Sequence, residues 1–449
     1  MSNAHRSFGL TGSRSGKACG HREAIALLQS GRAEAGSLLP YGNGRSYGDS
    51  CLNSAGTLAD MRGMNRVLAF DPATGVIEAE AGAMLSDIIA HAAPYGFFPA
   101  VVPGTRLVTL GGAIANDIHG KNHHRRGAFG RHVEALTLMT SDGATRRISR
   151  AAAPELFAAT VGGMGLTGLI LSATIRLMRV PSLDIDQRIQ AFGDLDEYFD
   201  MAEAADKANE YAVAWIDQLA GGRKAGRGLL ITGNHAEYGA RSAGDARVRL
   251  SVPFQPPLNL LNRPFLKIFN AAYLWRKGRA REIQTVGHTG FFFPLDGVGE
   301  WNRLYGPDGL YQHQSVAPAS EAKQAIPALL AAAREAGQGS FLTVLKRFGD
   351  LPSPGVLSFP RPGYTLTLDF PNRGQATLKL LERLDRIAVD AGGAVNPYKD
   401  ARMSPGVFAA SFPEWRQLEA CRDPAFMSDF WRRTAMRLNG EERRPVAAE

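Results

Sequence analysis

Three glycine-rich clusters in the first 170 residues constrain the fold of this 449-residue chain. One of them, Gly163, Gly165 and Gly168, matches the pattern G-x-G-x-x-G, but an expected helix precedes it and an expected strand follows. The dinucleotide-binding Rossmann unit needs a strand first and a helix second, so that a pyrophosphate meets the helix N-terminus. The order therefore favours a tight helix-to-strand turn over a Rossmann site.

The second cluster, YGNGRSYGDS at residues 41–50, follows the apolar Leu38 and Leu39. No helical period follows it, which again argues against a Rossmann helix. Glycines free to reach positive φ can turn successive backbone N–H groups toward an anion. The cluster predicts an anion-binding loop, and a plain turn is the alternative.

The third cluster, PGTRLVTLGGAIANDIHGKNHH, spans residues 103–124. Small residues that allow close backbone approach, followed by dense polar side chains, are typical of the wall of a cofactor site. His119, His123 and His124 are of the type that binds metal ions. Because Gly120 argues against the single helical face that an i, i+4 ligand pair needs, we predict no metal site.

Composition is that of a folded, soluble protein, with 45% apolar and 21% charged residues. Three widely spaced cysteines offer no disulfide framework and favour a reducing compartment. The N-terminus lacks the pattern of a signal peptide, and no apolar stretch reaches the ~18 residues that span a bilayer. We expect a cytoplasmic protein that contacts the inner face of the cell membrane at most peripherally.

Positive charge is concentrated between residues 222 and 282. The chain has a net charge of +8, and this window alone has twelve basic and three acidic residues. Its apolar part, residues 252–275, is interrupted by prolines that forbid one continuous helix. Apolar anchors flanked by Lys and Arg favour docking on an anionic lipid surface. A loop packed on its own core is the alternative, and nucleic-acid binding is disfavoured because no recognition helix or repeated aromatic platform is present.

Hydrophobic patterning predicts an α+β fold. In the first half we expect strands at 58–60, 67–70, 76–81, 136–140 and 169–177, with helices at 86–93 and 155–160. Glycine becomes less frequent at Pro181, where a second domain is expected. Its expected elements are helices at 195–209, 320–336 and 374–391 and strands at 339–348 and 364–370.

The motifs YGNGRSYGD, PGTRLVTLGGAIANDIHGKNHH and TVGGMGLTGLI resemble the FAD-binding domain of the vanillyl-alcohol oxidase class of flavoproteins. The resemblance runs from about Tyr41 to Arg433 and includes GEWNRLYGP at 299–307 and YKDAR at 398–402. It implies a two-part FAD-binding domain, residues 1–182 and 394–449. An α+β substrate domain built on an antiparallel sheet, residues 183–393, is inserted between them.

The resemblance also implies which residues contact FAD. The first glycine loop cradles the pyrophosphate, through Gly42, Asn43, Gly44, Arg45, Ser46, Tyr47, Gly48 and Asp49. Further contacts come from Gly104, Thr109, Leu110, Gly111, Gly112, Asn116, Asp117, Ile118, His119, Ile170, Asn396 and Lys399. Many relatives tether FAD covalently through a histidine in the first loop. Because Arg45 stands in the matching place, we expect noncovalent FAD.

A flavin that oxidises a secondary alcohol needs a base for the hydroxyl proton and a positive group beside the reduced ring. The resemblance gives Lys399, His119 and Tyr47 as catalytic candidates, with Lys399 favoured for charge stabilisation and the base left open. The substrate side is implied to include Lys121, Gln312, Gln314, Lys346 and Thr367. Patterning leaves open whether Lys346 points toward a site or toward water. Two positions depart from the relatives that the chain resembles. Thr367 stands where those relatives have a cysteine, and Asn396 stands where they have a tyrosine.

The activity implied is FAD-dependent oxidation of the 2-hydroxyl of a polyprenylphosphoryl-β-D-ribose to the 2-keto sugar. A partner NAD(P)H-dependent keto-sugar reductase would complete epimerisation to the arabinose form for cell-envelope polysaccharide synthesis. The alternatives are an alditol or aldonolactone oxidase that acts on a soluble sugar, and a catalytically silent lipid or polyanion binder. The basic, apolar segment favours the lipid-linked substrate.

Overall fold

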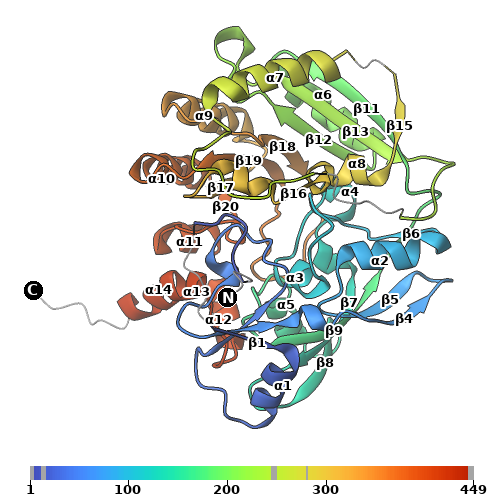
Figure 1. The fold of residues 1–449 in the computed structure, drawn as a ribbon, viewed down its shortest axis with the longest axis vertical. Coiled ribbons are helices and arrows are strands. Elements are labelled where there is room, and N and C mark those ends of the chain that lie inside the picture. The colour runs from blue at the N-terminus through green and yellow to red at the C-terminus, as the bar shows by residue number, and fades with distance from the viewer. Residues whose placement is uncertain (1–4, 12–16, 244–249, 280–281, 443–449) are drawn as a thin grey trace, which may run out of the picture.

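The computed structural model describes residues 5–11, 17–243, 250–279 and 282–442. Figure 1 shows two halves. The lower half holds the first strands and helices together with the C-terminal helices, and the upper half is built around one large sheet. This mixture of helices with mostly antiparallel sheets is the expected α+β fold.

The lower half contains two main sheets. A parallel sheet has the strand order β1 (Lys17–Gly20), β3 (Thr57–Asp60) and β2 (Leu38–Tyr41), beside helix α1 (His21–Gln29). An antiparallel sheet has the order β4 (Val67–Asp71), β5 (Val76–Glu80), β9 (Leu169–Arg176), β7 (Val133–Met139) and β8 (Thr145–Ser149). The remaining elements are α2 (Leu85–Ala92), α3 (Leu110–Ala115), α4 (His123–Arg126), α5 (Pro154–Thr160) and the short pair β6 (Phe97–Phe98) and β10 (Met178–Arg179).

Helix α3 packs closely on the antiparallel sheet. Its N-cap is Thr109, whose Oγ1 accepts a hydrogen bond from the Gly112 N–H at 3.2 Å. Leu110 and Ile114 lie one turn apart and are buried in the core of this half. A Cβ on Gly111 would lie 3.0 Å from the Ala81 Cβ, so glycine permits this approach. The polar residues that follow α3 are thereby held at the edge of the sheet.

The upper half is built on an eight-stranded antiparallel sheet. Its strand order is β15 (Gln284–Val286), β11 (Ile185–Phe192), β13 (Gly228–His235), β12 (Tyr211–Ile216), β18 (Val344–Phe348), β19 (Gly363–Pro371), β17 (Leu310–Ala317) and β20 (Ala394–Val395). Helices pack on one face of it: α6 (Leu195–Ala208), α9 (Ala322–Glu335) and α10 (Gln375–Asp390). The other elements are α7 (Arg263–Lys277), α8 (His288–Phe292) and the strand pair β14 (Leu250–Ser251) and β16 (Val298–Gly299).

The three strands β17, β19 and β18 have one apolar and one polar face. Leu345, Leu366 and Leu368 point to the helices and are buried with them. On the opposite face Gln314 pairs with Thr367, and the neighbouring register positions are also polar. Because side chains alternate along a strand, six polar residues from the three strands share this face. They are Gln312, Gln314, Lys346, Thr365, Thr367 and Asp369.

The C-terminal segment returns to the lower half. It forms α11 (Pro405–Ser411), α12 (Trp415–Cys421), α13 (Asp429–Arg433) and α14 (Ala435–Glu442). Leu39 and Leu58 from the first sixty residues share one buried cluster with Trp415 and Trp431. Among the described residues, no helix combines the length and the apolar character needed to cross a membrane.

Candidate active site

The loop after β2 has the backbone of an anion-binding loop. Gly44 has a φ of +60°, and a Cβ there would lie 2.1 Å from the Tyr41 Oη. The backbone N–H groups of residues 43–47 donate no hydrogen bond to another described residue. Successive free amides in a turn of this kind suit the oxygens of a diphosphate. The loop therefore fits the pyrophosphate of FAD, and only glycine allows its conformation at residue 44.

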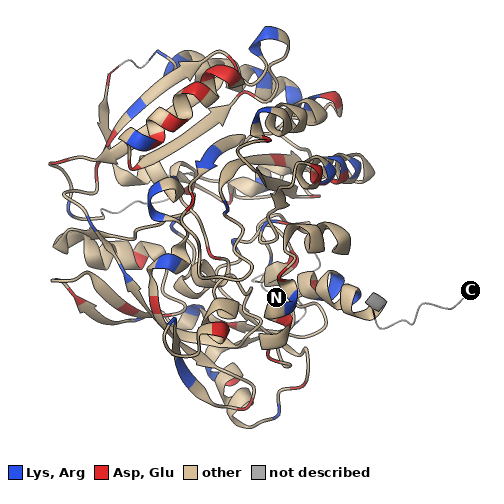
Figure 2. Cartoon of the chain, turned by 180° about the vertical axis from the view of Figure 1, so that it is seen from behind, with Lys and Arg blue, Asp and Glu red and all other residues tan. Residues whose placement is uncertain are grey.

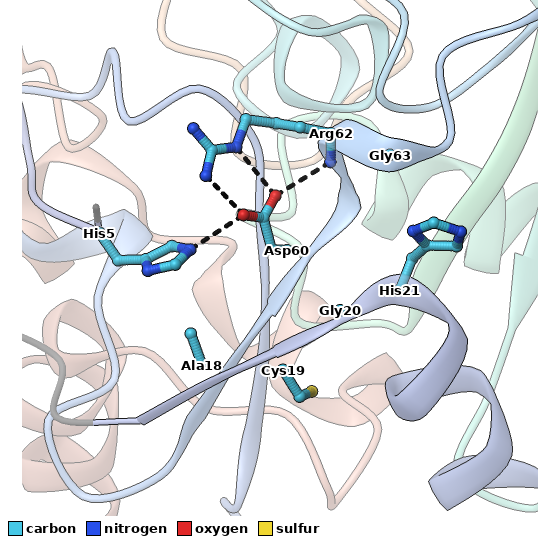
Figure 3. A pocket seen from close by; sticks show the side chains of 8 residues that line it. All are labelled: His5, Ala18, Cys19, Gly20, His21, Asp60, Arg62 and Gly63. Atoms are coloured by element: carbon cyan, nitrogen blue, oxygen red, sulfur yellow. Dashed lines mark hydrogen bonds and ion pairs between the residues drawn. The ribbon is translucent and has the colours of Figure 1, made fainter. Parts of the chain in front are cut away.

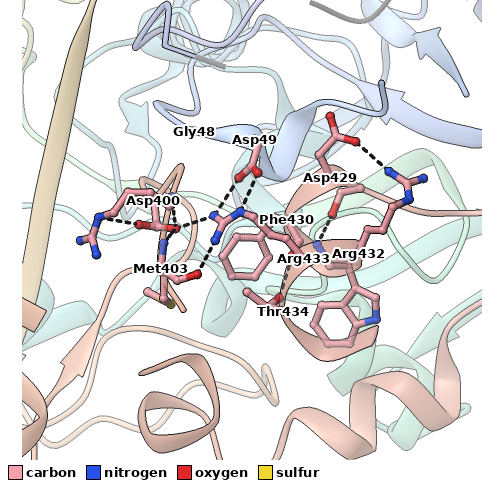
Figure 4. Close-up of polar contacts among 12 residues, drawn as sticks. Gly48, Asp49, Asp400, Met403, Asp429, Phe430, Arg432, Arg433 and Thr434 are labelled. Carbon is pink, nitrogen blue, oxygen red and sulfur yellow. Dashed lines mark hydrogen bonds and ion pairs between the residues drawn. The ribbon is translucent and has the colours of Figure 1, made fainter. Parts of the chain in front are cut away.

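The same loop is pressed against the turn that carries Lys399. A Cβ on Gly48 would lie 1.5 Å from the Asp400 carbonyl oxygen, so the two backbones touch. Arg433 joins both sides, with its Nε 2.7 Å from the Asp49 Oδ2 and its Nη2 2.5 Å from the Asp400 Oδ2 (Figure 4). An additional hydrogen bond goes to the Met403 carbonyl. Residues more than 350 positions apart in the sequence thus form one wall of the site.

The residues near α3 that were predicted to contact FAD differ from one another in burial and in hydrogen bonding. Leu110 and Ile170 belong to the buried core of the lower half, with Ile118 packed against it. Asn116 donates from Nδ2 to the Gly112 carbonyl at 2.9 Å. No atom lies within 4 Å of the place where a Cβ on Gly104 would be. The Asn43 side chain ties the first loop to this segment, since its Nδ2 donates to the Leu107 carbonyl at 2.8 Å.

Asp117 joins the two halves of the molecule. Its buried carboxylate accepts from the Gly130 N–H at 2.7 Å and from the hydroxyls of Ser353 and Ser358. Burial raises the pKa of this carboxyl, and the two serine hydrogen bonds oppose that shift. The side chain is fully used inside the protein, and the contact of Asp117 with FAD stays a prediction.

The polar sheet face meets the lower half at His119. The Gln314 Nε2 lies 3.1 Å from the His119 Nε2 and 3.0 Å from the Thr365 Oγ1. Asn396 donates from Nδ2 to the Gln314 Oε1 at 2.9 Å. Because the amide donates, the His119 Nε2 is an acceptor and the imidazole is neutral. Burial, helped by Lys346 and Lys399, holds the pKa of His119 well below its usual 6.5.

Three predicted lysines, Lys121, Lys346 and Lys399, lie around the same place. The Lys346 Nζ is 3.4 Å from the Gly120 carbonyl oxygen, which answers the open question of its direction. Lys121 donates to the Phe291 carbonyl, and the Lys399 Nζ lies 5.7 Å from the centre of the Tyr47 ring. Burial lowers the pKa of Lys121 and of Lys346 to about 7, and that of Lys399 to about 8. An anionic ligand would restore their charge.

Two functional candidates, Asp369 and Tyr305, escaped the sequence reasoning. Asp369 is wholly buried, and its Oδ1 accepts from the Gln312 Nε2 at 2.5 Å. Burial raises the pKa of its carboxyl to about 7. Tyr305 lies nearby in a buried cluster that Tyr47 packs against. The alternation in YTLTLDF holds the missing signal for Asp369, because it puts residues 365, 367 and 369 on one face.

The three histidines considered for a metal have separate partners. His119 contacts Gln314, whereas the His123 ring lies 4.5 Å from the Phe348 ring. The His124 Nε2 lies 3.1 Å from the Asn209 carbonyl oxygen. Within the described ranges, no group of three or more His, Cys, Asp or Glu side chains is placed to hold a metal ion.

A separate pocket of about 600 Å³ opens at the edge of the parallel sheet (Figure 3). Its Asp60 is paired with the His5 Nε2 at 2.9 Å and with the Arg62 Nη2 at 2.5 Å. These partners hold the pKa of Asp60 near 2 against the effect of burial. None of the predicted site residues lines this pocket, so it is not part of the candidate active site.

The donor set fits a flavin dinucleotide, with free amides for the diphosphate and half-buried cations beside a neutral imidazole. The model of the FAD binding domain family matches residues 20–149, which contain the glycine loop and α3. Fold and site thus define an FAD-dependent oxidoreductase, as expected. Decaprenylphosphoryl-beta-D-ribose oxidase of Mycolicibacterium smegmatis is 36% identical over 92% of this chain and 92% of its own length. The chain therefore belongs to the decaprenylphosphoryl-β-D-ribose oxidase family of FAD-linked oxidoreductases.

Two further relatives show how the similarity is distributed. An uncharacterised protein of Streptomyces coelicolor is 34% identical over 76% of this chain and 97% of its own length. L-gulonolactone oxidase of Bos taurus is 29% identical over 42% of this chain and 41% of its own length. The similarity to the soluble-sugar oxidase thus covers less than half of either chain.

Proposed function

We propose that this protein oxidises the 2-hydroxyl of a polyprenylphosphoryl-β-D-ribose to the 2-keto sugar with FAD as the oxidant. The observation that carries the proposal is the polar face of the large sheet, which meets three half-buried lysines and His119. A similarity to decaprenylphosphoryl-beta-D-ribose oxidase over 92% of the chain supports it. A keto sugar needs a hydride donor to become arabinose, so a partner NAD(P)H-dependent reductase would consume the product.

Each group of residues has a distinct task in this proposal. FAD, when bound, accepts the hydride from the sugar carbon. The loop at residues 42–49 holds the cofactor diphosphate, and Lys399 supplies positive charge for the negative charge that develops on the cofactor. Lys121 and Lys346 bind the substrate phosphate. Burial keeps the pKa of Tyr47 well above 10, so its phenol donates hydrogen bonds, and the base is His119 or Lys399.

Anaerobic mixing of the holoenzyme with synthetic polyprenylphosphoryl ribose tests the activity. We expect the visible flavin band to bleach and the 2-keto sugar to form in equal amount. L-Gulono-1,4-lactone and free sugar alcohols serve as controls and should leave the band unchanged. Bleaching by a soluble substrate, with none by the lipid-linked ribose, would replace the proposal with a soluble-sugar oxidase.

We also propose that FAD is held without a covalent bond. The residue in the tethering position is Arg45, whose guanidinium carbon lies 5.6 Å from the centre of the Phe8 ring and has no nucleophilic character. Acid precipitation should therefore release all flavin into the supernatant as intact FAD. Flavin mass retained on the denatured protein would contradict this.

A docking surface for a lipid membrane surrounds α7. Pro264 stands in the first turn, where its missing N–H costs nothing, so a helix forms at the end of the proline-rich segment. Leu266 and Asn270 are buried, whereas Phe265, Ile268 and Trp275 are 46–73% exposed on the other side. The docking surface consists of the exposed residues Leu250, Phe254, Leu258, Leu260, Phe265, Lys267, Ile268, Trp275, Arg276 and Arg279.

Basic side chains border this docking surface. Figure 2 shows Lys and Arg at the same end of the molecule, on the turn at residues 222–224 and along α7. The Arg279 guanidinium lies 4.3 Å from the centre of the Trp275 ring. Arg247, Arg249 and Arg281, which were counted in the basic window, lie outside the described residues. Exposed apolar side chains with a basic border suit an anionic bilayer, which would present the prenyl chain of the substrate.

Sedimentation with phosphatidylglycerol-containing vesicles tests the docking surface. Ile268→Glu combined with Trp275→Glu should weaken vesicle binding by at least tenfold and leave FAD content unchanged. Leu68→Glu is the matched control, since Leu68 is 46% exposed on β4 in the other half of the molecule. Equal binding by all three proteins would contradict membrane docking through α7.

A further inference from the structure

Three buried polar atoms near Lys399 have no hydrogen-bond partner among the described residues. They are the Tyr305 Oη, the Gln312 Oε1 and the Asp369 Oδ2. The exposed fractions of these residues are 3%, 7% and 0%. A buried polar group without a partner costs about as much free energy as a lost hydrogen bond. Three such atoms in one place therefore indicate that a polar ligand completes them.

Strand pairing holds two of these atoms in fixed positions. Gln312 on β17 and Asp369 on β19 are register partners. The Gln312 Nε2 donates to the Asp369 Oδ1 at 2.5 Å, which leaves Oε1 and Oδ2 as the free acceptors. The Asp369 N–H donates to the Ser340 Oγ at 2.9 Å, so the strand itself is also anchored.

The charge of the Asp369 carboxylate also influences Tyr305 and Lys399. The charge of Asp369 adds to burial in raising the pKa of Tyr305 and of Tyr47, and it opposes the effect of burial on Lys399. Such influences weaken as the distance between the charges grows, so they are strongest between groups that lie close together. Together with the packing of Tyr47 against the cluster that contains Tyr305, they bring these groups to one side of the candidate active site.

The chemistry of the three atoms selects one part of the substrate. Two acceptors and one hydroxyl match sugar hydroxyls, each of which can donate one hydrogen bond and accept another. A phosphate would be repelled by the Asp369 carboxylate, and a prenyl chain offers no donor. We propose that Asp369, Gln312 and Tyr305 form a subsite for the non-reacting hydroxyls of the sugar, in which Asp369 determines specificity. This inference rests on the function proposed above and adds Asp369 and Tyr305 to its substrate residues.

Binding of non-oxidisable analogues tests the subsite. The 2-deoxy form of polyprenylphosphoryl ribose cannot react at C2, so its dissociation constant from the holoenzyme is measurable by calorimetry, at pH 8 so that Asp369 is ionised. Asp369→Asn should weaken this binding by about tenfold to a hundredfold, as expected for a hydrogen bond to a charged group. Asp308→Asn, a change at an exposed carboxylate, should have no effect.

Analogues that also lack the hydroxyl at C3 or at C5 locate the contact. For one of these analogues, the missing hydroxyl should weaken binding to the wild-type protein by the same factor by which Asp369→Asn weakens binding of the 2-deoxy analogue. Its absence should not weaken binding to Asp369→Asn any further. Tyr305→Phe should show smaller losses of the same kind, and it provides a second variant should Asp369→Asn misfold. If each variant lost the same affinity for every analogue, the proposed subsite would be wrong, while the proposed function would stand. Failure of the wild-type protein to oxidise the ribose lipid would overturn the proposed function, and the subsite with it.

Discussion

Lys346 shows how a buried charge makes binding depend on pH. Burial lowers the pKa of this lysine to about 7, so the free amine is largely neutral above that pH. An anionic phosphate prefers the ammonium form, and binding above pH 7 must therefore take up a proton. We expect substrate affinity to fall by up to about tenfold per pH unit for each such lysine above pH 7. Lys346→Met should bind the 2-deoxy analogue about tenfold more weakly at pH 7 and with a shallower slope above it.

Measurement of that dissociation constant from pH 6 to pH 9 checks the prediction. Lys379→Met is the control, because Lys379 is exposed on α10. A variant at Lys346 with the slope of the wild type would show that another group carries the proton.

Single residues of the site were predictable only to the extent that a motif contains them. His119 and Lys399 follow from DIHGKNHH and YKDAR, which are local patterns. The direction of Lys346 depends on its pairing with Thr365 across two strands, which patterning alone leaves open. Asp369 was missed because its partner Gln312 is 57 positions away in the sequence. The alternation in YTLTLDF places Asp369 on the same face as Thr367, but the residue that Asp369 contacts depends on tertiary structure.

Arg433 on α13 links the two elements that together form one wall of the site. It bonds to Asp49 in the glycine loop and to Asp400 beside Lys399. Removal of the Arg433 guanidinium would leave the buried carboxylates of Asp49 and Asp400 without its positive charge, and the loss of one partner of a buried ion pair costs about 3 kcal/mol or more. Arg433→Ala should therefore lower the free energy of unfolding by about 3 kcal/mol. It should also weaken FAD binding, because the loop and the Lys399 turn would no longer be held together.

Urea denaturation and a flavin fluorescence titration measure the two effects. Arg383→Ala is the matched control, since Arg383 pairs with Glu335 on the surface at 2.7 Å with both side chains more than half exposed. Such pairs contribute at most about 1 kcal/mol. A loss of stability at Arg433 no larger than at Arg383 would contradict the linking role.

Element boundaries were predictable where the hydrophobic period was long and uninterrupted. The helices expected at 195–209 and 374–391 are α6 at 195–208 and α10 at 375–390. The strand expected at 339–348 begins only at Val344, because Gly339 and Ser340 turn toward β12 and Ser340 bonds to Gln218. Prolines rightly excluded one helix over 252–275, yet they concealed α7, whose Pro264 sits in its first turn.

At the scale of the whole molecule, the two halves share their structure too closely to unfold separately. β20 pairs with β17 in the large sheet, and the residues directly after it, Asn396 to Lys399, belong to the candidate active site. The Tyr398 Oη lies 2.8 Å from the Gly162 carbonyl oxygen and 2.7 Å from the Leu357 carbonyl oxygen, and these two acceptors share its one proton. Asp117 makes a second buried bridge to Ser353 and Ser358. No exposed linker separates the halves at these places, in contrast with independent domains.

We therefore expect one cooperative unfolding transition. Far-ultraviolet circular dichroism reports the helices of both halves. Tryptophan fluorescence reports Trp415 and Trp431 of the lower half alone once Trp215, Trp275 and Trp301 of the upper half are replaced by phenylalanine. In urea both signals and the release of FAD should share one midpoint, because loss of the Asp117 and Tyr398 bridges exposes both cores at once. The variant Asp117→Asn, which keeps the shape but removes the charge that three donors share, should shift all three signals to lower urea together. If the fluorescence midpoint moved while part of the circular dichroism change kept its former midpoint, the halves would be separate folding units, and the bridges would be mere contacts between them.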